Sequence, residues 1–276
     1  MMKSSLAVLR LDKELMVFPV LSGLATILVT ASFLTPAFAF GSGWDTIGTI
    51  AEQGGYDLYF VAFLYYLACY FVVFFFNTAL VGAAMIRLEG GDPTVSDGLR
   101  IAFDRLPSIL GYAAIAATVG MILRMVEERL GVVGRFVAGL LGVAWSLATY
   151  LTVPILVTRD VGAIDAVKES AQTFRRTWGE QVIANASIGL ASFVIVLLMT
   201  ALFVPALIVA GSINGVLVLG VVASFIGGII FLSILTSALQ GIYSAALYRY
   251  ATTGDPGGPF DAGAMGAAFR ERKKFW

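Results

Sequence analysis

Long stretches of apolar residues dominate the chain, and short polar segments separate them. A stretch of about 20 apolar residues can cross the hydrocarbon core of a bilayer as a helix. Backbone groups inside that core must hydrogen-bond within their own segment, so each stretch is expected to be helical. The pattern predicts six transmembrane helices, at residues 16–40, 58–86, 107–125, 136–157, 182–210 and 216–248.

The polar segment at residues 159–180 has a different pattern, with apolar residues recurring at steps of three and four. This spacing puts them on one face of a helix. They are Ile164, Val167, Ala171, Phe174 and Trp178. Arg175 and Arg176 fall on other faces. A short helix with cationic residues on one side and Phe and Trp on the other is typical of the membrane interface. We expect it to lie on the bilayer surface.

Similar polar segments follow the second and the sixth predicted helices, and each contains Gly-Asp-Pro, at residues 91–93 and 254–256. Each of the three polar segments offers a residue suited to capping the N-terminus of a short helix. The caps are Thr94, Gly162 and Gly258, and the carboxylates three residues later are Asp97, Asp165 and Asp261. A carboxylate there can accept from the cap amide and interact with the helix dipole. An alternative is that Asp92 and these three aspartates bind a metal ion or phosphate.

The position of these segments suggests a repeated unit. The predicted fold is an all-α membrane protein of six transmembrane helices in three hairpins, each followed by a cytoplasmic interfacial amphipathic helix. We predict one membrane domain, residues 1–276, with a threefold hairpin repeat at 1–106, 107–180 and 181–276. The alternative is that Gly-Asp-Pro is ordinary turn chemistry that recurs by chance.

Composition agrees with a membrane location and narrows the chemistry. The chain is 59% hydrophobic and 13% charged, whereas soluble domains carry about 25% charged residues. It has no histidine, and Cys69 is its single cysteine, which excludes histidine-based nucleophile systems and cysteine or histidine zinc sites. We therefore expect no cofactor and no metal. The net charge is zero, so no nucleic-acid partner is expected.

Lysine and arginine are distributed unequally between the two sides of the predicted bundle. Of the 18, 15 fall on the side that holds both termini and the segments after the second and fourth helices. The positive-inside rule then places both termini in the cytoplasm. We expect a multi-pass protein of a prokaryotic inner membrane.

The predicted helices contain uncharged polar residues toward their cytoplasmic halves. They are Asn77, Thr78, Asn185, Ser187, Ser237 and Gln240. These residues are candidates for a polar pocket; the alternative is that they bond between helices or to their own backbone. No acidic or basic residue lies deep in any stretch, which argues against proton-coupled transport.

Small residues recur at four-residue steps in two of the predicted helices. Gly134, Ala138, Gly142 and Ser146 form one stripe, and Gly220, Ser224 and Gly228 form the other. Such stripes let helices approach closely. We expect them to pack the bundle, and an oligomer interface is the alternative.

Two segments carry a family resemblance. Residues 8–15 with Phe18 and Pro19, and residues 153–178, resemble an uncharacterised group of six-helix bacterial and archaeal integral membrane proteins. The second segment is also loosely similar to the membrane domain attached to some glycerophosphodiester phosphodiesterases. The resemblance implies fold and location. It implies no activity, because no phosphodiesterase domain accompanies these helices.

The expected function is that of a non-enzymatic structural or accessory subunit. Its expected partners are membrane lipids and either further copies of itself or other membrane proteins. The alternative is a channel or a carrier for lipid or a small solute that uses the polar halves of the second, fifth and sixth helices. An enzyme would require cytoplasmic aspartates that converge on one pocket.

Overall fold

The computed structural model describes residues 2–41, 56–177, 182–261 and 263, and within them the regular structure is helical. Among these residues, five stretches are long and apolar enough to cross a membrane. They are Lys13–Pro36, Tyr59–Leu88, Leu106–Thr158, Ala191–Ile213 and Gly215–Thr253. Apolar helices of this length are typical of a multi-pass membrane protein.

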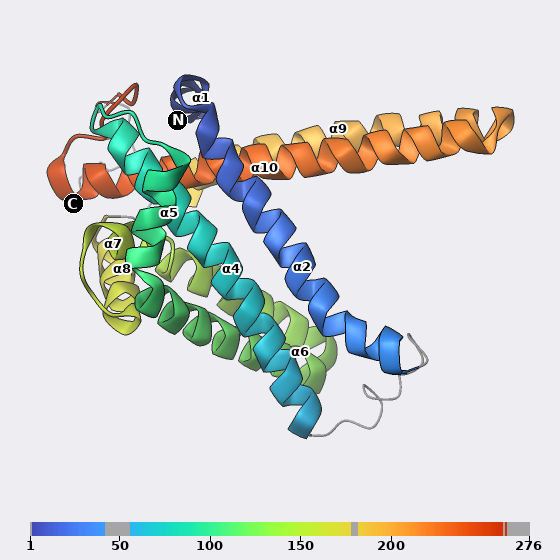
Figure 1. The fold of residues 1–276 in the computed structure, drawn as a ribbon, viewed down its shortest axis with the longest axis horizontal. Helices are drawn as coiled ribbons and strands as arrows, with labels where there is room; N and C mark the ends of the chain where they lie inside the picture. Colours follow the sequence, from blue (N-terminus) through green and yellow to red (C-terminus); the bar gives the residue numbers. More distant parts are fainter. Residues whose placement is uncertain (1, 42–55, 178–181, 262, 264–276) are drawn as a thin grey trace, which may run out of the picture.

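The long helices spread out from one end of the molecule (Figure 1). They are α2 (Val17–Phe40), α4 (Tyr56–Leu88), α6 (Leu106–Ala148), α9 (Val182–Ile213) and α10 (Gly215–Thr253). Helices α2 and α4 lie side by side, whereas α9 and α10 form a hairpin that projects away from the others (Figure 1). The short helices α1 (Met2–Leu11), α5 (Val95–Asp104), α7 (Thr152–Thr158) and α8 (Ala163–Thr177) gather at the end where α10 finishes. We call this the polar end.

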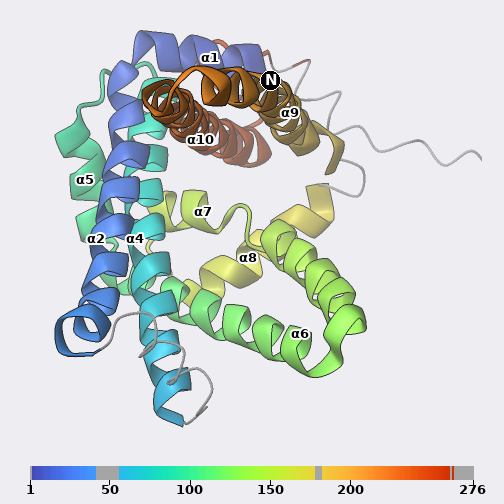
Figure 2. The same ribbon diagram turned by 90° about the vertical axis from the view of Figure 1, so that its right-hand side faces the viewer.

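Helix α6 corrects the sequence-based boundaries of the third and fourth predicted helices. The two were expected to be separated by a polar loop at residues 126–135, but helix continues through it except at Gly131. Gly131 has φ 56° and ψ −126°, a conformation that glycine adopts readily. The helix turns sharply there (Figure 2). A Cβ on Gly142 would lie 3.8 Å from Leu123, so the two arms of α6 pack against each other.

A second interruption, between α6 and α7, is closed by a side chain from α8. The buried Leu151 N–H donates to Ser170 Oγ at 3.1 Å, and Ser170 Oγ donates to Ala148 O at 2.7 Å. Both Leu151 and Ser170 are fully buried. Ser170 thus satisfies backbone groups that the helix break leaves without an intrahelical partner, and it fastens the amphipathic helix to the bundle.

The packed core lies toward the polar end. Its largest fully buried side chains come from segments far apart in the sequence: Leu15, Phe18, Leu80, Ile109, Leu151, Ile155, Leu156, Leu239, Ile242, Tyr243 and Leu247. The remote ends of the long helices are exposed, as Leu202 at 74% and Val216 at 77% illustrate. Exposed apolar side chains are expected where lipid is the solvent.

Helix α1 is an element that the sequence pattern did not predict. The first transmembrane helix was predicted to begin at residue 16, and no helix was predicted before it. In the structure Val8 and Leu9 are buried, and α1 packs against α10. The signal was a short run in which Ser5, Val8 and Leu9 share one helix face, too short to stand out beside the basic residues.

Replacing Ser170 with alanine tests the connection between α8 and the break after α6. Ser170→Ala leaves the buried Leu151 N–H without its acceptor, which costs about 1–3 kcal/mol. We expect the midpoint of thermal unfolding of the purified protein in detergent to fall by several degrees. Ser146→Ala is the matched control, because Ser146 is exposed and bonds only to Gly142 O in its own helix. Equal midpoints for both variants would contradict this role of Ser170.

Candidate functional site

A cavity of about 270 Å³ lies between α2, α4 and α10 near the polar end, with the segment between α6 and α7 at its side. Apolar residues form one part of its wall: Phe18 and Pro19 of α2 and Val73, Phe76 and Leu80 of α4. Uncharged polar residues and a glycine form the other part: Ser22, Asn77, Tyr150, Ser237, Gln240, Gly241 and Ser244. We call it the α2–α4–α10 cavity.

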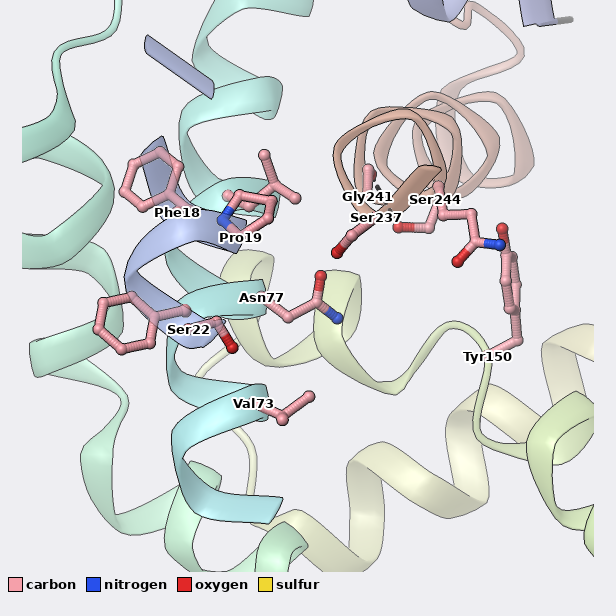
Figure 3. Close-up of a pocket in the computed structure, with 12 residues that line it drawn as sticks. Phe18, Pro19, Ser22, Val73, Asn77, Tyr150, Ser237, Gly241 and Ser244 are labelled. Atoms are coloured by element: carbon pink, nitrogen blue, oxygen red, sulfur yellow. Dashed lines mark hydrogen bonds between the residues drawn. The ribbon is translucent and has the colours of Figure 1, made fainter. Parts of the chain in front are cut away.

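Three of the residues predicted to form a polar pocket meet at this cavity. Asn77 lies on α4, and Ser237 and Gln240 lie on α10. Figure 3 shows Asn77 and Ser237 turned toward one another across the space between the two helices. Within the described residues no hydrogen bond joins the side chains of Asn77, Ser237 or Gln240 to a protein group. These donors and acceptors are therefore available to a ligand.

Gly241 sets the close approach of α4 and α10 beside the cavity. A Cβ added to Gly241 would lie 2.4 Å from the Leu80 side chain and 3.6 Å from Asn77 Oδ1. The missing side chain therefore leaves space that Leu80 occupies, and it allows the Asn77 amide to face α10.

The other residues of the predicted pocket have different positions. Thr78 is fully buried and donates to Phe74 O at 2.7 Å, so its hydroxyl is satisfied within α4. Asn185 and Ser187 belong to α9, but their side chains lie outside the described residues. The sequence reasoning missed Ser22 and Tyr150, which come from other parts of the chain. No local pattern marks either of them.

The cavity lies within the apolar length of the long helices. Val73 is at the middle of the stretch Tyr59–Leu88, and Asn77 lies about 16 Å along the helix from Leu88. Val73 is 43% exposed, and Ser237 and Gln240 are also exposed. These exposed positions belong to stretches that are long and apolar enough to span a membrane. The described residues that line it include no charged side chain.

At the polar end, the expected cap of α5 is present. Thr94 Oγ accepts from Asp97 N at 3.2 Å, and Asp97 Oδ2 accepts from Thr94 N at 2.9 Å, which together form a capping box. Hydrogen bonds from the Thr94 hydroxyl and backbone lower the pKa of Asp97. Glu14 Oε2 also accepts from Val95 N at 3.1 Å, so the segment just before α2 is linked to α5.

Ion pairs join further segments at this end. Arg87 Nε lies 2.7 Å from Asp12 Oδ2, and the same guanidinium contacts Asp92. The Asp12 carboxylate is almost fully buried, with 6% of its side chain exposed. Arg159 Nη1 donates to both oxygens of Glu169, at 2.7 and 2.8 Å. These pairs hold the N-terminal segment to α4, and the end of α7 to α8.

The second polar segment has the expected helix start. Helix α8 begins after Gly162, so Asp165 takes the third helical position, with Lys168 Nζ 3.9 Å from its Oδ1. Phe174 is half-buried against the core and Arg175 is exposed. The Arg176 side chain and Trp178 lie outside the described residues.

The third polar segment corrects a prediction. Gly258 was expected to cap a helix, but Gly257 and Gly258 both have positive φ, 72° and 56°. An N-cap residue usually has extended backbone, so Gly258, which is left-handed, does not cap a helix. Residues 258–259 form a turn instead. Asp261 instead accepts from Gly263 N at 2.8 Å. The predicted helix at 262–269 falls outside the described residues apart from Gly263.

The two predicted stripes of small residues differ in what they contact. Gly134 and Ala138 are buried at the bend of α6, where a Cβ on Gly134 would lie 2.4 Å from Val126 O. Gly142, already placed beside Leu123, and Ser146 continue the same arm. Gly228 packs against Met199 of α9, whereas Gly220 has no atom within 4 Å of an added Cβ. Ser224 donates to Gly220 O in its own helix at 2.8 Å.

The carboxylates considered as metal ligands do not come together. Among the described residues, no group of three or more His, Cys, Asp or Glu side chains is arranged to hold a metal ion. Asp92 contacts Arg87, Asp97 accepts from Thr94, and Asp165 lies near Lys168. Each therefore has a structural partner of its own.

Comparison with known proteins places the chain in a family. No curated protein and no solved structure matches it. Residues 57–258 match a family of unknown function (DUF6159), and this segment includes the walls of the cavity that α4 and α10 provide. Because the match covers more than half of the 276 residues, the chain belongs to this family of unknown function.

Proposed function

We propose that the protein is a non-enzymatic membrane protein that binds a lipid or a small solute in the α2–α4–α10 cavity, as a carrier or channel does. The observation that carries this proposal is the convergence of Asn77, Ser237 and Gln240 on one cavity within the apolar length of α4 and α10. A concave, mostly apolar site with a few polar groups is the usual form of a small-molecule site.

The proposal includes six crossings in three hairpins. The apolar stretch Leu106–Thr158 is 53 residues long and bends at Gly131. The arm from Leu106 to Leu130 is about 37 Å long, enough for one crossing. The second arm, with α7, supplies another. Helix α1 and the last turns of α10 lie at the polar end, which supports a cytoplasmic location for both. The threefold repeat and the similarity to phosphodiesterase membrane domains stay predictions.

Support for a non-enzymatic role comes from the sequence. The chain contains no histidine and one cysteine, Cys69, so the common nucleophile and general-base pairs are not available to it. The uncharged cavity wall likewise favours binding over acid–base chemistry.

Cysteine labelling tests the orientation. In a Cys69→Ser background, Ser212→Cys places a thiol beside the α9–α10 turn, and Arg175→Cys places one at the polar end. We expect a membrane-impermeant maleimide to label Ser212→Cys in intact spheroplasts, and Arg175→Cys only after lysis. The reverse order would place the termini outside the cytoplasm and contradict the proposed topology.

Removing polar groups from the cavity wall tests the binding function. Asn77→Leu combined with Gln240→Leu removes both amides, and the loss of about two hydrogen bonds lowers affinity roughly thirtyfold. Native mass spectra of the wild-type protein should show a copurifying ligand. In the double variant, we expect the ratio of ligand-bound to free protein to fall by about that factor.

The matched control for this experiment is Thr118→Leu with Thr200→Leu. Both threonines are exposed, and their hydroxyls bond only to carbonyls of their own helices. Equal ligand occupancy in the two double variants would show that the cavity is not the binding site.

A second candidate function is that of a structural or accessory subunit that assembles with copies of itself or with other membrane proteins. The specific observation in its favour is Gly220 on α10, where an added Cβ would have no protein atom within 4 Å. A helix face at such a residue permits a close helix–helix contact.

Blocking this face tests assembly. Gly220→Leu would prevent close approach, so we expect higher-order species in native nanodiscs to become monomeric if the face is an interface. Gly139→Leu is the control, because Gly139 on α6 is also open. A wild-type protein that is monomeric and captures no partner would refute this second candidate.

A further inference from the structure

The depth of the α2–α4–α10 cavity restricts what can enter it. Three residues of its wall are exposed, Val73, Ser237 and Gln240, and each belongs to a stretch that can span a membrane. A ligand therefore arrives from within the bilayer. The exposed Val73 and the neighbouring Phe76 form an apolar path from the lipid to the polar part of the wall.

The charge of the cavity restricts the ligand further. No charged side chain is among the described residues that line the cavity. An ionised phosphate at this depth would lose its water without gaining a counter-ion, which is costly. An uncharged hydroxyl or ester loses far less, and hydrogen bonds from the wall replace its water.

The polar groups of the wall match a ligand that both donates and accepts hydrogen bonds. The amides of Asn77 and Gln240 each provide a carbonyl acceptor and an NH₂ donor, and the Ser237 hydroxyl can do either. A hydroxyl with an adjacent ester carbonyl has the same dual character. A simple alkyl chain would leave these groups without partners.

The size of the cavity indicates that only part of a lipid enters. A volume of about 270 Å³ corresponds to roughly nine water-sized groups. That accommodates a glycerol unit and the first atoms of its ester groups. The acyl chains would then remain in the bilayer beyond Val73.

From depth, charge and hydrogen-bonding capacity together, we propose that the cavity binds the head of an uncharged, hydroxyl-bearing lipid of the diacylglycerol type. This inference rests on the proposed function, because it assumes that the cavity is a ligand site. It adds the chemical class of the ligand and its direction of approach.

Photolabelling of the full chain in nanodiscs tests the proposal. One probe is a diacylglycerol with a diazirine near the glycerol end of an acyl chain. The other is phosphatidylglycerol with the same chains and the same diazirine. At equal mole fraction, we expect the neutral probe to label residues 73–80 and 237–244 at least fivefold more than the charged probe. Asn77→Leu with Gln240→Leu should abolish this difference, while labelling of the lipid-exposed α9–α10 hairpin stays the same.

The possible outcomes separate this inference from the proposed function. Equal or stronger labelling of the cavity by phosphatidylglycerol would overturn the neutral class but leave lipid binding in place. Competition by glycerol as effective as that by unlabelled diacylglycerol would assign the site to a small polyol and overturn the lipid class. Labelling no higher than on the α9–α10 hairpin, together with no copurifying ligand, would refute both proposals.

Discussion

A bilayer does not drive apolar helices together in the way that water does, because lipid tails are as apolar as leucine. The distribution of packing in this protein follows from that constraint. Large buried side chains such as Tyr243 and Ile155 lie toward the polar end, where amphipathic helices cover the bundle. The far ends of α9 and α10 expose their apolar side chains. Side-chain packing thus stabilises the structure at the polar end, whereas the far ends of α9 and α10 present an apolar surface suited to lipid.

The same solvent makes every interruption of a helix expensive, because a backbone group in an apolar environment finds no water. The chain meets this demand with specific polar side chains. Ser170 satisfies the break after α6, and Asn214 caps α10 by accepting from Leu217 N at 2.9 Å. At the polar end Thr94 and Asp97 do the same for α5. Polar residues are few in this sequence, and several of them serve this purpose.

The cavity is a consequence of how the hairpins diverge. Helix α10 meets α4 closely at Gly241 and then runs away from it with α9 (Figure 1). The space beside this contact exposes the amides of Asn77 and Gln240, which make no side-chain hydrogen bond among the described residues. Unpaired amides in an apolar region are unfavourable, so a site of this kind is best stabilised by a ligand or by ordered water. This is why the cavity, and not the ion pairs, carries the functional proposal.

Composition and the length of apolar stretches were enough to identify a multi-pass membrane protein, because the thickness of the bilayer imposes a length that is visible in the sequence. Capping at Thr94 was also predictable, since both partners lie within four residues of each other. Three features were not predictable from the sequence. They are the bend at Gly131, the bonds of Ser170 to a segment about 20 residues earlier, and the place of Ser22 and Tyr150 at the cavity. Gly258 was assigned wrongly for a related reason: a glycine can cap a helix or form a left-handed turn. Only the tertiary structure decided these points, because they depend on contacts between segments whose separation in the sequence leaves no periodic signal.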